Sequence, residues 1–200
     1  MKYRIVIPFI FLAMMVLQSS ALPMQISEED RIVNLLDERD HLIKELIGPE
    51  GSTYTEEQRQ ELTEIINDII DYQAMAKTAL DSTYDTISEE EREKFVNLFS
   101  TIIRQQSLSQ LNIYRAEVVY DNVEVSGDSA LVETTAILDN VRTPVLYEME
   151  RRNDEWVITD MAIDNVWTAE SYRRSFQNQI RRRGFDALLT SLERRADRQQ

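Results

Sequence analysis

The stretch that decides the fold is residues 143–192, TPVLYEMERRNDEWVITDMAIDNVWTAESYRRSFQNQIRRRGFDALLTSL. It opens with a strand pattern, since Val145, Tyr147 and Met149 alternate with polar residues and so share one face. Asn153-Asp154 predicts a turn, and residues 155–164 predict a second strand, rich in residues that suit a pleated sheet. The two strands therefore form an antiparallel hairpin.

The second part of this stretch has helical spacing. Tyr172, Phe176 and Ile180 recur on one face, while most arginines fall elsewhere on the surface. Gly184 ends this helix, and the apolar spacing from Phe185 to Leu192 predicts another. The stretch as a whole predicts two strands followed by two helices.

Two further strands precede this stretch. Residues 114–125 and 130–138 read as strands, joined by a hairpin turn at Ser126-Gly127-Asp128. Asp139-Asn140 predicts the turn into the next strand. The four strands together predict an antiparallel meander.

Amphipathic helices fill the chain before the strands. Ser27, the capping-box pair Thr55 and Gln58, and Ser88 each mark a helix start, and a break is expected near Asp71. Helices, then strands, then helices indicate an α+β fold. We expect one domain over residues 22–200, with a helical part at 27–111, a four-stranded antiparallel sheet at 114–164 and C-terminal helices at 168–195 that help to cover the sheet.

Residues 1–21 have the layout of a secretory signal peptide. Lys2 and Arg4 precede an apolar run from Ile5 to Leu17, and small residues follow up to Ala21. The run is short for a transmembrane helix, which needs about 20 residues. We therefore predict export to the periplasm with cleavage after Ala21. The sequence has no cysteine, which suits a periplasmic domain stabilised by its core.

The composition excludes several kinds of chemistry. The net charge of −14 argues against nucleic acid as a partner, and one histidine without cysteine cannot build a zinc site or a histidine-based triad. Among the carboxylates, Asp160 lies between apolar residues, where it can serve as a base with a raised pKa or accept structural hydrogen bonds. The structural role is favoured. We expect no enzyme activity, no cofactor and no metal.

Several motifs resemble one protein family. Trp156-x-Ile158-x-Asp160, Tyr172-Arg173-x-x-Phe176 and the run Gly184-Phe185-Asp186-x-Leu188-Leu189 are similar to the C-terminal half of the MlaC-type family. This family, also called the toluene-tolerance family, is the periplasmic phospholipid-binding component of the Mla system, which maintains outer-membrane lipid asymmetry. The helix after Ser88 also resembles the family, whereas Asp81 stands where the family often has glycine.

The resemblance implies a fold related to nuclear transport factor 2, in which sheet and helices enclose an apolar cavity for acyl chains. It implies a carrier, acting as a monomer, that moves phospholipid between an outer-membrane lipoprotein–porin complex and the MCE-domain protein of an inner-membrane ABC transporter. Two acyl chains need roughly 900 Å³, at the large end of ligand pockets. Such a space fits only between layers. We expect it to be lined by residues of both layers, namely Phe99, Ile102, Tyr114, Val145, Tyr147, Met149, Ile158, Met161, Tyr172 and Phe176.

Two alternatives stay open at this level. The first is a non-catalytic periplasmic scaffold or binding module for another apolar ligand, such as an isoprenoid. The second is an enzyme that uses Asp160 as a base. Tyr147 and Tyr172 are candidates to place a hydroxyl at the cavity mouth, and the arginines at 173, 174 and 181–183 either meet a phosphate or acidic surface or form a solvated helix face.

Overall fold

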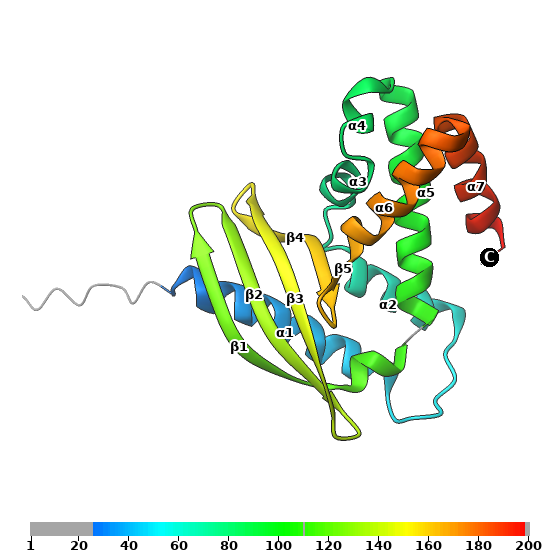
Figure 1. Ribbon diagram of the computed structural model, residues 1–200. Helices are drawn as coiled ribbons and strands as arrows, with labels where there is room; N and C mark the ends of the chain where they lie inside the picture. Colours follow the sequence, from blue (N-terminus) through cyan, green and yellow to red (C-terminus); the bar gives the residue numbers. More distant parts are fainter. Residues whose placement is uncertain (1–25, 110, 199–200) are drawn as a thin grey trace, which may run out of the picture.

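A five-stranded antiparallel sheet carries the long helix α1 (Glu28–Ile47) across one face (Figure 1). The structure is a computed structural model that describes residues 26–109 and 111–198, so the predicted signal peptide lies outside the described residues. The strands follow in sequence order, and each pairs with the next. They are β1 (Glu117–Ser126), β2 (Ser129–Leu138), β3 (Val141–Arg152), β4 (Glu155–Ile163) and β5 (Val166–Trp167).

The α+β class and the antiparallel meander are confirmed, with two differences from the sequence prediction. β5 adds a strand of two residues, too short to produce any alternation in the sequence. Tyr114 does not begin β1, because residues Leu111–Arg115 form the 3₁₀ helix η1 and the strand starts at Glu117. The apolar residues at 111, 113 and 114 follow one another too closely for periodicity to separate a 3₁₀ turn from a strand.

The hairpin turns use short polar side chains in the left-handed region. Asp139-Asn140, Asn153-Asp154 and Asp164-Asn165 each have positive φ at both positions, as a type I′ turn requires. The β1–β2 turn has positive φ at Gly127, the first central position of a type II′ turn. These turns match the right-handed twist of the strands and fix their register.

A bulge in β4 determines which side chains face α1. Met149 pairs with Ile158 and Tyr147 pairs with Met161, so the strand gains one residue at Thr159. Ile158 and Met161 therefore share the inner face of the sheet, although three positions separate them. Asp160 pairs with Glu148 and lies on the opposite face.

The other helices lie beyond the β4 edge of the sheet (Figure 1). The connection between α2 and α3 runs beside β4, where Ile70 forms a parallel bridge with Ile158 and Asp71 caps α3 through the amide of Ala74. This confirms the break expected near Asp71. The helices are α2 (Glu56–Asn67), α3 (Tyr72–Leu80), α4 (Thr83–Thr86), α5 (Glu89–Ser109), α6 (Thr168–Arg183) and α7 (Phe185–Asp197).

The described residues form three apolar cores, one of which joins α1 to α2 through Ile43, Ile47, Leu62 and Ile66. In the helical half, Phe95, Phe99 and Phe176 pack ring against ring, with centroids 5.6–5.9 Å apart. In the other half, α1 places Ile32 against the inner face of the sheet, which includes Val132 and Met149. The space between these cores contains the candidate site.

Candidate functional site

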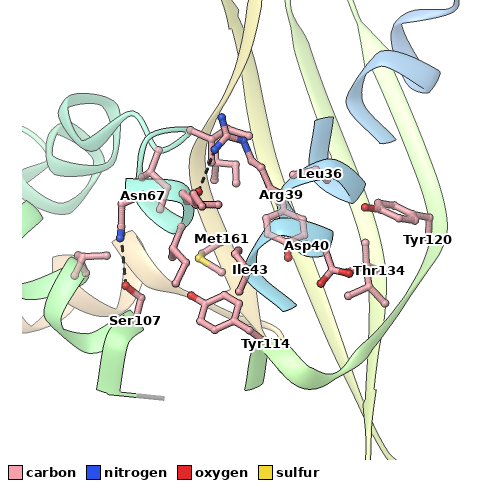
Figure 2. A pocket seen from close by; sticks show the side chains of 18 residues that line it. Leu36, Arg39, Asp40, Ile43, Asn67, Ser107, Tyr114, Tyr120, Thr134 and Met161 are labelled. Atoms are coloured by element: carbon pink, nitrogen blue, oxygen red, sulfur yellow. Dashed lines mark hydrogen bonds between the residues drawn. The ribbon is translucent and has the colours of Figure 1, made fainter. Parts of the chain in front are cut away.

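The first cavity lies between α1, the sheet, the α2–α3 connection and η1, and has a volume of about 150 Å³ (Figure 2). Its lining is mostly apolar, with isoleucines at 43, 65, 66, 69 and 70 opposite the aromatic and methionine side chains of the sheet. The lining residues are Leu36, Arg39, Asp40, Ile43, Ile65, Ile66, Asn67, Ile69, Ile70, Ile103, Ser107, Tyr114, Val118, Tyr120, Thr134, Tyr147, Ile158 and Met161.

A second cavity of about 300 Å³ adjoins the first. It lies between α5, the start of α6 and the β4–β5 hairpin, and its lining includes Met75, Ile113 and Tyr172. Two more lining residues, Ile163 and Val166, are 37% and 56% exposed. These exposed apolar side chains mark the side on which this cavity meets solvent.

Tyrosine hydroxyls bring neutral polar groups into the first cavity. Burial raises the pKa of Tyr147 to about 12, and the nearby Asp40 carboxylate adds to the rise. Burial likewise raises the pKa of Tyr114 and Tyr120 above the ordinary value. All three phenols stay protonated at neutral pH, so they can donate or accept hydrogen bonds without introducing charge.

Charged residues of α1 line the first cavity on one side. The Arg39 guanidinium donates to the Ile65 carbonyl at 3.0 Å and pairs with Asp68, which links α1 to the end of α2. The Asp40 carboxylate pairs with Lys44 at 2.6 Å, one turn further along α1. These ion pairs keep charge at the border of an otherwise apolar space.

Asp160 has a structural role in this fold. It is 5% exposed, faces away from the first cavity and accepts hydrogen bonds from the amides of Met161 and Ala169, at 2.8 and 3.1 Å. Trp167, the residue before α6, provides no side-chain cap, so the Asp160 carboxylate takes that role from β4. Burial raises the pKa of Asp160 to about 6, against the opposing effect of these two hydrogen bonds.

The structure brings together half of the residues predicted to line the site. Tyr114, Tyr147, Ile158 and Met161 line the first cavity, and Tyr172 joins Tyr114 and Met161 in the second. The other five do not line either cavity. Phe99, Ile102 and Phe176 are buried in the helical core, Met149 in the core between α1 and the sheet, and Val145 within β3.

Sequence reasoning missed the contributions of α1 and of the α2–α3 connection. Leu36, Ile43 and Ile69 belong to apolar stripes that the sequence displays, but a stripe does not reveal what it faces. Arg39 and Asp40 carry no such signal, because a charged pair on a helix is usually solvated. They reach the cavity because α1 packs across the sheet, and no local pattern in the sequence encodes that packing.

Comparison with known proteins agrees with this architecture. A solved phospholipid-binding protein from Ralstonia solanacearum, in complex with a phospholipid, superposes with a TM-score of 0.72 at 18% identity, covering 87% of this chain and 99% of that one. Curated proteins give no significant match. Within residues 26–109 and 111–198, no helix combines the length and apolar character that a membrane span requires. The model of the MlaC protein family matches residues 39–194, and the chain therefore belongs to that family.

Proposed function

We propose that this protein is a periplasmic carrier that binds the acyl chains of a phospholipid in its two adjoining cavities. The observation that carries the proposal is the apolar space between α1, the sheet and α5 in a member of the MlaC family. The phospholipid bound by the Ralstonia solanacearum protein of the same fold supports the choice of ligand. Asp160 lines neither cavity, so it is not placed to act as a base on a ligand bound there, as the enzyme hypothesis required.

The energetics of acyl chains favour a carrier that works by direct transfer. Burying one methylene is worth about 0.8 kcal/mol, so exposing two chains of about 15 methylenes costs roughly 24 kcal/mol. This exceeds the roughly 18–21 kcal/mol at which non-covalent affinities saturate. A lipid therefore has to move directly from one apolar environment to another in which burial of its acyl chains is about equally favourable. We infer that the partners are an outer-membrane lipoprotein–porin complex and the MCE-domain protein of an inner-membrane ABC transporter.

The cavity volumes require the protein to widen around a two-chain lipid. Two acyl chains need roughly 900 Å³, whereas the cavities measure about 150 and 300 Å³. Arg39 lines the first cavity, and its ion pair with Asp68 links α1 to the end of α2 beside that cavity. Both side chains are partly exposed, so this contact is weak enough to open without unfolding either helix.

Native mass spectrometry of the protein after export by a Gram-negative host tests the proposal. The expected spectrum contains the chain without residues 1–21 plus one phospholipid mass, and solvent extraction identifies the headgroup and chain lengths. An isoprenoid mass would support the alternative apolar ligand. A bare chain that also takes up no lipid from phosphatidylethanolamine–phosphatidylglycerol vesicles would refute the carrier function.

A further inference from the structure

The two cavities share one wall. Four described residues line both of them, namely Ile103 and Ser107 of α5, Tyr114 of η1 and Met161 of β4. Figure 2 shows the ring of Tyr114 beside Met161 at this boundary. Met161 is unbranched and adapts its rotamer easily, whereas the tyrosine ring is rigid. Tyr114 is therefore the largest rigid side chain of the wall, which it shares with the smaller Ile103 and Ser107.

The backbone around Tyr114 is firmly held. Its neighbour Arg115 donates hydrogen bonds to the carbonyls of Ile47 and Gly48 and to the hydroxyl of Tyr54. These contacts fasten η1 to the C-terminal end of α1. The Tyr114 ring thus has a defined position, set by α1 on one side and by α5 on the other.

The wall limits what a single acyl chain can fill. If a methylene takes about 30 Å³, the volume that a water molecule occupies in the liquid, the second cavity holds roughly ten methylenes and the first roughly five. Because the exposed Ile163 and Val166 line the second cavity, we expect an acyl chain to enter there. A chain that enters there meets Tyr114 when that cavity is full.

We propose that Tyr114 is a specificity-determining residue that sets the length of acyl chain this protein prefers to bind. Its ring closes the inner end of the second cavity, so methylenes beyond about ten gain no further burial until the ring is displaced. This inference rests on the proposed function. It adds that the protein discriminates between lipids by the length of the acyl chain. Neither the headgroup nor the phenolic hydroxyl takes part in the selection.

The test is a chain-length series of lysophosphatidylglycerols from C8 to C18, each titrated below its critical micelle concentration. In the unaltered protein, affinity should rise about fourfold per methylene and level off near ten. Tyr114→Ala should extend the rise by about five methylenes, since it joins the two cavities. The matched control Tyr114→Phe keeps the ring and should level off where the unaltered protein does.

Three outcomes separate the possible failures. If Tyr114→Ala levels off at the same length as the unaltered protein, or if Tyr114→Phe shifts as far as Tyr114→Ala, the role of the ring is refuted while the carrier function stands. If no chain length binds the unaltered protein, the proposed function fails first. Thermal unfolding checks each variant, and Tyr114→Leu, which retains apolar packing, decides the question should Tyr114→Ala not fold.

Discussion

The carboxylate of Asp160 in β4 accepts a hydrogen bond from the amide of Ala169 at 3.1 Å, and by this contact the sheet caps the first turn of α6. The same oxygen accepts a bond from the Met161 amide at 2.8 Å. The group is buried, and Glu148 and Glu170 add negative charge around it. One side chain therefore joins the two halves of the molecule and carries an ionisable proton.

The raised pKa of Asp160 makes the stability of the fold depend on pH. Its pKa is about 6 in the folded protein against an ordinary value of 3.8, so the folded state binds more protons between these values. The contribution of this group is therefore greatest in acid and is lost as pH rises towards 6. Asp160→Asn removes the titration, and its stability relative to the unaltered protein should improve by up to about 3 kcal/mol from pH 4 to pH 7. Urea unfolding at four pH values measures this difference, and parallel curves for the two proteins would contradict it.

Asp81 occupies a backbone conformation that favours glycine. Its φ of 50° and ψ of −138° end α3 in a region that costs other residues about 1–3 kcal/mol. Asp81→Gly relieves this strain but gives up the partly exposed ion pair with Arg173, worth about 0–1 kcal/mol. The variant should be at least as stable as the unaltered protein and at most about 3 kcal/mol more stable. Asp81→Ala loses the same ion pair and keeps the strain, so chemical denaturation should show it to be the less stable of the two.

Phe176 belongs to the core and lines neither cavity. It is 4% exposed and meets the rings of Phe95 and Phe99 edge to face. Phe176→Ala should cost about 3–5 kcal/mol of unfolding free energy. The chain-length profile of lipid binding should stay the same, provided the titration is done where the variant is folded. A changed profile would mean that the cavity extends into the helical core when loaded.

Arg115 stabilises the C-terminal end of α1. Its guanidinium donates to carbonyls that the helix itself cannot satisfy, and Tyr54 adds a bond to the Ile47 carbonyl at 3.0 Å. Arg115→Ala should lower the unfolding free energy by about 2–4 kcal/mol, since hydrogen bonds to a charged group are each worth about 1.5–3 kcal/mol. Arg115→Lys retains the charge but lacks the planar guanidinium, so its unfolding free energy should lie between those of Arg115→Ala and the unaltered protein. Equal stability of all three proteins would show that solvent satisfies these carbonyls.

How far the sequence predicts this structure depends on whether a feature is local. The turn at Asn153-Asp154 and the capping box at Thr55 are set by neighbouring residues, and both were predictable. Tyr114 was misassigned to a strand because a five-residue 3₁₀ helix leaves no periodic signal. The bulge at Thr159, which turns Met161 towards the cavity, depends on pairing with β3 and has no signature in β4 alone.

The site was only partly predictable for a related reason. Phe99 and Phe176 sit on apolar helical stripes as regular as any that line the cavity, yet they pack against each other. Tyr172, on the same helix as Phe176, reaches the second cavity. Apolar spacing identifies the buried face of a helix, but only the packing of the helices decides whether that face meets a neighbour or an empty space.

The bridge between Ile70 and Ile158 has a mechanical consequence for loading. The amide of Ile158 donates to the Ile69 carbonyl at 2.8 Å, and the amide of Asp71 donates to the Ile158 carbonyl at 2.9 Å. These backbone hydrogen bonds form a seam that joins the helical half to β4. The seam consists of backbone hydrogen bonds, whereas α1 on the other side of the first cavity is held by side-chain contacts, namely the packing of Ile32 and Ile47 and the partly exposed ion pair of Arg39 with Asp68. We expect the interior to grow around a lipid by rearrangement of the side-chain contacts between α1 and its neighbours, while the backbone hydrogen bonds of the seam stay in place.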